Sequence, residues 1–75
     1  MTLKDGAPGM VVRIDSVDAS NLKNRLMTMG LIPGTRVTVL PSAPMGDPMA
    51  ISVRSYSLAL RREDAARIRV SPVSA

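Results

Sequence analysis

Carboxylates are the first side chains to consider for chemistry in this sequence, because histidine and cysteine, which most often serve as general bases and nucleophiles, are both absent. The six carboxylates are Asp5, Asp15, Asp18, Asp47, Glu63 and Asp64. Each stands beside an expected turn or helix start, where acidic side chains accept hydrogen bonds from free backbone amides. We therefore predict that they cap the backbone or face solvent, that no residue is catalytic, and that the protein is not an enzyme.

Transition-metal binding is disfavoured on the same grounds, since zinc and iron sites are usually built from imidazole and thiolate ligands. Six methionines offer thioethers, but Met27 and Met29 lie two apart on an expected helix and point to different sides. We interpret Met29 as core filler. Met27 lies off the buried stripe, and two interpretations stay open for it: packing under a loop, or an adaptable apolar contact for a partner. We predict no metal site and no cofactor.

Arginine dominates the charge: eight of the ten cations are arginine, and the formal net charge is +4. Such a surface attracts phosphates, acidic proteins and anionic membranes alike. The arginines expected on outward faces are Arg13, Arg36, Arg54, Arg61, Arg67 and Arg69. Binding of single-stranded nucleic acid depends on aromatic platforms, and Tyr56 is the only aromatic residue. We expect no nucleic-acid partner; a nucleic-acid-binding barrel remains the alternative, recognisable by salt-dependent binding to oligonucleotides.

The length of 75 residues leaves room for one small core, so we expect one domain over residues 1–75. Without cysteine the fold cannot be held by disulfides, which favours a reducing, cytoplasmic location. No apolar run is long enough to span a membrane, so contact with a membrane is expected only through a partner. The chain begins with its own methionine and contains no helical DNA-binding part, and we expect the protein to consist of this domain alone.

A short amphipathic helix is predicted over about residues 20–29, because Leu22, Leu26 and Met29 recur at the i, i+4, i+7 spacing of one helix face. Gly30 is suited to the left-handed position just after the helix, with Leu31 folding back onto Leu26 in a Schellman contact. The end of the helix is therefore marked in the sequence.

Strands are predicted on both sides of this helix, because apolar residues alternate there with polar ones. The expected strands cover residues 10–16, 35–39, 49–54, 58–61 and 67–70, with one helical turn over 62–66 and a frayed tail from residue 71. Five short strands with only one helix-length crossover exclude a parallel α/β layer. We predict a mainly β fold: a small five-stranded antiparallel SH3-like barrel, with one short α-helix after the first strand and one helical turn before the last.

Three ordered motifs resemble the FeoA family. Residues 25–34, RLMTMGLIPG, match a helix that ends in Met-Gly-Leu before a Pro-Gly turn; residues 43–48, APMGDP, match the family's hairpin; residues 58–65 and 68–70 match its leucine-arginine ending. The resemblance runs from about Leu3 to Val70. One departure is Ser55, which stands where many relatives have glycine before a tyrosine.

The resemblance implies an SH3-like barrel in the cytoplasm that works alongside FeoB, a membrane transporter with a cytosolic G-protein domain, in ferrous-iron uptake. The expected contact is with that domain or with another cytoplasmic segment of the transporter. A similar barrel occurs as the C-terminal domain of metal-dependent repressors, and a detached domain of that type is a second alternative. The motif positions that we assign to backbone turns are Gly30, Pro33, Gly34, Pro44, Gly46, Asp47 and Pro48.

Our hypothesis for the partner-binding surface is a shallow apolar patch at the end of the helix with a basic rim, a composition that suits docking to a protein. Its predicted members are Arg25, Met27, Leu31, Ile32, Arg54 and Tyr56. A further hypothesis is that an arginine reaches into the G-protein site and stimulates GTP hydrolysis. Exposed arginines alone do not distinguish this role, because every basic surface presents them.

Overall fold

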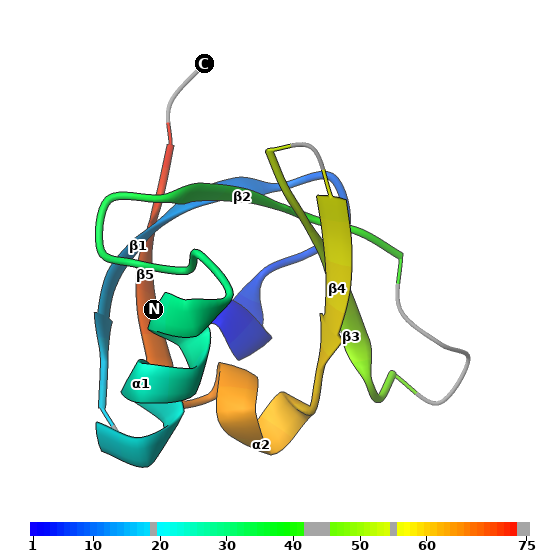
Figure 1. Cartoon of the computed structure of the whole chain (residues 1–75). Helices are drawn as coiled ribbons and strands as arrows, with labels where there is room; N and C mark the ends of the chain where they lie inside the picture. The colour runs from blue at the N-terminus through cyan, green and yellow to red at the C-terminus, as the bar shows by residue number, and fades with distance from the viewer. Residues whose placement is uncertain (19, 42–45, 55, 74–75) are drawn as a thin grey trace.

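A computed structural model describes residues 1–18, 20–41, 46–54 and 56–73, and Figure 1 shows its arrangement. Its elements in chain order are η1 (Leu3–Asp5), β1 (Val11–Val17), α1 (Ser20–Thr28), β2 (Arg36–Val39), β3 (Met49–Val53), β4 (Tyr56–Leu60), α2 (Arg62–Ala65) and β5 (Ile68–Pro72). The five strands form one antiparallel sheet in the order β4-β3-β2-β1-β5. The predicted mainly β arrangement, with a helix after the first strand and a helical turn before the last, is confirmed.

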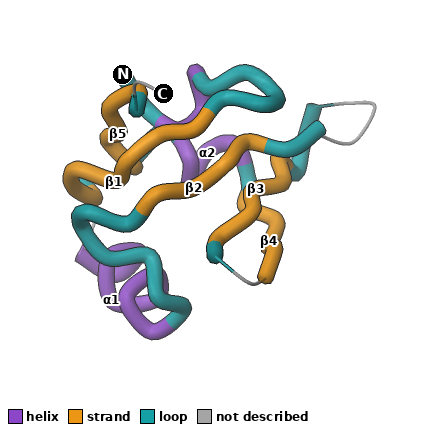
Figure 2. The backbone as a smooth tube through the Cα atoms, turned by 90° about the horizontal axis from the view of Figure 1, so that it is seen from above, coloured by secondary structure: helices purple, strands orange, loops and turns teal. Residues whose placement is uncertain are grey.

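Strand β1 organises the sheet because it pairs with β2 along one edge and β5 along the other. The register shifts between Ile14 and Ser16, at a bulge that bends β1 and lets the sheet curl, as the curved path of β1 in Figure 1 shows. Helix α2 then joins the two edge strands, β4 and β5, and Figure 2 shows α1 at the lower left with the β3–β4 pair to its right.

The core follows the strand alternation, with one face of every strand turned inward. Val12 pairs with Val37 and Ile14 with Val70, and all four side chains are buried. Leu3 of η1 is fully buried among them. This short 3₁₀ turn was not predicted, because the first residues contain no apolar run from which to infer it.

Two predicted boundaries need correction at the ends of the sheet. Strand β5 continues through Ser71 and Pro72, which pair with Arg13 and Val12, so the expected fraying from residue 71 is wrong for these two residues. The cause is the length of β1, whose first residues supply backbone partners beyond Val70. Strand β4 begins at residue 56, two residues earlier than expected.

No helix within the described ranges is long and apolar enough to cross a membrane; α1, with nine residues, is far shorter than a membrane span.

Candidate functional site

The C-terminal end of α1 is closed by a Schellman motif, as the sequence predicted. Gly30 has a φ of 88°, the N–H of Leu31 donates to the carbonyl of Leu26 at 2.8 Å, and the N–H of Gly30 donates to that of Met27 at 3.0 Å. These bonds satisfy carbonyls that a helix otherwise leaves free. They also swing the chain inward, so that Leu31 is fully buried.

The Pro33-Gly34 turn holds the next segment against β1. The N–H of Thr35 donates to the carbonyl of Ile32 at 3.1 Å, and Gly34 has a φ of 94°, the geometry that a type II turn requires. The N–H of Gly34 donates to the carbonyl of Ile14 at 2.7 Å. The N–H of Ile14 in turn donates to the carbonyl of Thr35 at 2.9 Å. The turn is therefore a fixed support beside the helix end.

Tyr56 brings β4 to the same place. Its hydroxyl donates to the carbonyl of Met29, and a Cβ added at Gly30 would lie 3.4 Å from the tyrosine oxygen. Val53 and Tyr56 are paired, so only two residues link β3 to β4, and the first of them, Arg54, has a left-handed φ of 50°. The β3–β4 turn and the helix end are thus adjacent.

Four apolar or aromatic side chains are exposed around this junction: Met27 (47%), Met29 (36%), Ile32 (45%) and Tyr56 (43%). We call these four residues the helix-end patch. Exposed large apolar groups that gather at one place are typical of binding surfaces. Three of the predicted partner-binding residues, Met27, Ile32 and Tyr56, are thus exposed on the segments that meet at this junction.

Two of the predictions about this region are wrong. Leu31 is fully buried and offers no surface to a partner; it supports the helix-end patch from below. Met29 was expected in the core but is exposed, because α1 ends at Thr28 and the turn at Gly30 gives the buried position to Leu31 instead. The left-handed position of Gly30 was predicted, but its consequence for Met29 was not: a left-handed residue there places Met29 at the end of the helix rather than on its buried face.

The two predicted rim residues, Arg25 and Arg54, are both exposed. Within the described part of the chain, neither has a carboxylate within 4.0 Å. The ion pairs present lie elsewhere: Arg13 with Asp15, Arg61 with Glu63, and Arg69 with Asp18.

A second structured region joins the turn before β3 to the start of α2. The backbone N–H of Arg62 donates to Asp47 Oδ1 at 3.0 Å, and the Nε of Arg62 donates to the carbonyl of Gly46. Gly46 has a φ of 78°, and a Cβ there would lie 3.3 Å from the Arg62 guanidinium. Gly46 and Asp47 thus have the backbone roles that the sequence suggested. Pro44 and Ser55 lie outside the described residues.

A shallow depression adjoins this turn, lined by Asp47, Pro48, Arg61 and Glu63. Asp47 already accepts a hydrogen bond from the backbone amide of Arg62, and Glu63 Oε1 lies 3.7 Å from Arg61 Nη1. Among the residues that the structure describes, no group of three or more acidic side chains is placed to hold a metal ion.

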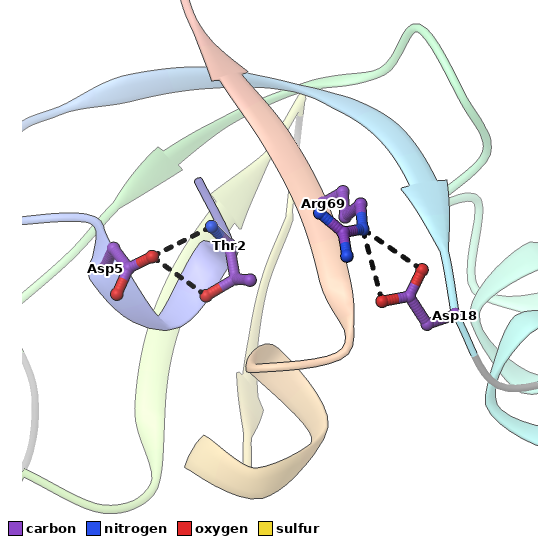
Figure 3. Close-up of polar contacts among 4 residues, drawn as sticks. All are labelled: Thr2, Asp5, Asp18 and Arg69. Atoms are coloured by element: carbon purple, nitrogen blue, oxygen red, sulfur yellow. Dashed lines mark hydrogen bonds and ion pairs between the residues drawn. The ribbon is translucent and has the colours of Figure 1, made fainter.

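Three further carboxylates, Asp5, Asp15 and Asp18, have side-chain partners, and Figure 3 draws those of Asp5 and Asp18. Asp5 accepts from the backbone N–H of Thr2 at 2.9 Å and from its hydroxyl at 3.1 Å, and the backbone bond is the main reason that the pKa of Asp5 is lowered. Asp18 lies 3.3 Å from Arg69 Nε. Asp15 accepts from the hydroxyl of Ser71.

The sequence and the structure of this chain were compared with those of known proteins. The FeoA domain model matches residues 1–72. Among curated proteins, the "Fe(2+) transport protein A/Fe(2+) transporter FeoB fusion protein" of Porphyromonas gingivalis is 35% identical over 72 residues, which are 96% of this chain. The chain spans only 8% of the length of that relative.

Solved structures agree with the family match. The FeoA protein of Chlorobium tepidum superposes with a TM-score of 0.92 at 33% identity, covering 99% of this chain and 71% of that one. The zinc-complexed FeoA of Stenotrophomonas maltophilia, a prokaryotic SH3 domain protein, has a TM-score of 0.81 at 28% identity, covering 95% and 89%. The manganese regulator SloR, at 19% identity and a TM-score of 0.84 over 34% of its chain, shares the fold alone.

Proposed function

This chain belongs to the FeoA family, and on that premise we propose that it is a small accessory protein of bacterial ferrous-iron uptake that acts by binding the FeoB membrane transporter. The observation that carries the proposal is the fusion relative, in which a segment 35% identical to this chain shares one polypeptide with FeoB. In a fusion, the covalent linkage raises the effective concentration of one domain near the other. Two separate chains can make the same contact, but a smaller fraction of them is bound at a given concentration.

We place the contact at the helix-end patch, with Arg25 and Arg54 on its rim. Methionine adapts its shape to a partner, and tyrosine supplies a large contact area with a polar tip. An apolar centre with a charged rim is the common anatomy of protein–protein interfaces. The Schellman motif and the Pro33-Gly34 turn support the patch with backbone hydrogen bonds, so little order has to be gained when the partner binds.

The proposed partner segment is the cytoplasmic G-domain of FeoB, and the proposed location of this protein is the cytoplasm. Its action is proposed to be contact rather than catalysis, because the sequence contains neither histidine nor cysteine and most of its carboxylates have a backbone or side-chain partner. On the same proposal residues 1–75 form one FeoA-type domain without a cofactor.

A titration tests the proposal. We would add the FeoB G-domain, with and without nucleotide, to isotope-labelled protein and follow the backbone amide signals by NMR. The expected result is saturable shifts confined to residues 25–34 and 54–58. If a folded G-domain causes no shift at either set of residues, the proposed partner is wrong.

Variants locate the surface in the same experiment. Met27→Asp and Tyr56→Ala should weaken binding while the fold persists. Val11→Asp is the matched control, because Val11 is also an exposed apolar residue, 38% accessible, but lies on β1. Equal binding by Met27→Asp and the parent protein would exclude the helix-end patch as the docking surface.

A further inference from the structure

Charge is segregated along this chain. No carboxylate occurs between Asp18 and Asp47, yet the same stretch contains Lys23, Arg25 and Arg36. All three ion pairs found in the described residues involve carboxylates outside this stretch; the pair of Arg69 with Asp18 is drawn in Figure 3. The segment between these two aspartates, which contains α1 and the Pro33-Gly34 turn, therefore has basic side chains and no acidic ones.

The unpaired cations stand beside the exposed apolar residues. Lys23 precedes Met27 by four residues on α1, and Arg25 precedes Met29 by four, so each exposed methionine lies about one helical turn from a cation. Arg54 lies two residues before Tyr56, in the β3–β4 turn. Within the described residues none of Lys23, Arg25 and Arg54 has a carboxylate within 4.0 Å. We call these three residues the basic rim.

From this arrangement we infer that the docking surface of the partner is acidic: an apolar centre that covers the helix-end patch, surrounded by aspartate and glutamate side chains that face the basic rim. The inference rests on the proposed function and specifies the chemistry of the partner. Opposite charges across an interface orient the encounter and accelerate association. Arginine also pairs with carboxylates through two parallel hydrogen bonds, which fixes the register of the contact.

An anionic membrane would also attract the basic rim, but the centre of the surface does not suit lipid. The negative end of the α1 dipole points there, which disfavours phosphate headgroups over the helix end. A protein surface can place donors at the centre and carboxylates only at the rim.

The test measures how binding to the FeoB G-domain depends on salt and on the basic rim. For the parent protein we expect Kd to rise about tenfold between about 50 and about 500 mM NaCl, because salt screens exposed charges. The variant Lys23→Glu/Arg25→Glu should bind at least about tenfold more weakly at the lower salt concentration, mainly through slower association, and lose most of its salt dependence. Both substitutions lie on exposed helix positions.

The matched control is Arg61→Glu/Arg67→Glu, which changes the net charge by the same amount at exposed positions outside α1. Its Kd should stay within about threefold of the parent value, since rim charges act over a short screened distance. If all three proteins bind equally and salt has no effect, the acidic-partner inference is wrong while the FeoB proposal stands. If no complex forms at any salt concentration, the proposed function itself fails.

A vesicle experiment separates the lipid alternative. Vesicles with about one third phosphatidylglycerol are compared with pure phosphatidylcholine, a contrast that reports electrostatic membrane binding. Neither should retain the protein if the basic rim faces an acidic protein. Retention on the anionic vesicles that Lys23→Glu/Arg25→Glu abolishes, with binding to the G-domain unaffected by that variant, would overturn the inference in favour of a membrane surface.

Discussion

The backbone amide of Arg62 donates a 3.0 Å hydrogen bond to the carboxylate of Asp47, although 15 residues separate the two in the sequence. The residue that precedes α2, Arg61, makes no capping bond with its own side chain. Asp47 therefore supplies the acceptor that the start of α2 needs, and Arg62 returns a bond from its Nε to the carbonyl of Gly46. The turn before β3 and the start of α2 are thus one unit.

We predict that Asp47→Ala lowers the free energy of unfolding by about 0.5–2 kcal/mol, the usual cost of losing a helix cap. Asp47→Asn keeps an oxygen acceptor and should recover most of that loss. Urea denaturation followed by circular dichroism measures both variants. If Asp47→Asn and Asp47→Ala lower the free energy of unfolding equally, the capping role assigned to Asp47 is incorrect.

A second prediction concerns two glycines with left-handed backbone. Gly30 and Gly34 have φ values of 88° and 94°, but only at Gly30 would a Cβ approach another residue, the hydroxyl of Tyr56 at 3.4 Å. Both alanine variants should lose about 1 kcal/mol of stability through backbone strain. Gly30→Ala should lose at least as much as Gly34→Ala, and it should shift the NMR signals of Tyr56. A Gly30→Ala protein as stable as its parent would contradict the Schellman assignment.

The sequence predicted local features well, because each depended on residues close together in the chain. Alternation at Val12 and Ile14, the helix stripe at Leu22 and Leu26, and the left-handed Gly30 follow from backbone geometry alone. The ordered motifs then identified the family and with it the barrel.

What the sequence could not predict depends on pairs that meet only in the folded chain. The bond from Arg62 to Asp47 and the hydroxyl of Tyr56 on the carbonyl of Met29 join residues 15 and 27 positions apart. The errors over Met29 and Leu31 have a different cause. Met29 was assigned to the buried face because the helix stripe was extended one residue past the end of the helix at Thr28, and Leu31 was assigned to the surface although its Schellman contact buries it.

Asp5 provides a prediction about pH. Its pKa lies below the ordinary value of 3.8, chiefly because the backbone N–H of Thr2 donates to the ionised carboxylate. A pKa lowered by folding means that ionised Asp5 stabilises the fold: the contribution is complete above the ordinary value and is lost as the pH falls through the lowered one. A carbon-detected NMR titration should show the low pKa directly. Asp5→Asn should make unfolding less dependent on pH in the acid range, and titration of Asp5 at or above its ordinary value would refute the assignment.

The last prediction separates two neighbours that sequence reasoning placed in one surface. Leu31 is fully buried, whereas the side chain of Ile32 is 45% exposed. Leu31→Ala should therefore lower the free energy of unfolding by about 2–5 kcal/mol, because it removes buried methyl groups and leaves a cavity. Ile32→Ala should change it by no more than about 0.5–1 kcal/mol, as expected for an exposed position.

Binding to the FeoB G-domain should reverse the order of the two variants. At a temperature where both proteins are folded, Ile32→Ala should weaken the complex several-fold, because it truncates one of the exposed apolar side chains of the helix-end patch. Leu31→Ala should leave the affinity of the folded molecules close to that of the parent. Denaturation and calorimetric titration on the same two proteins measure both quantities. Loss of binding with Leu31→Ala but not with Ile32→Ala would show that the partner contacts a different face.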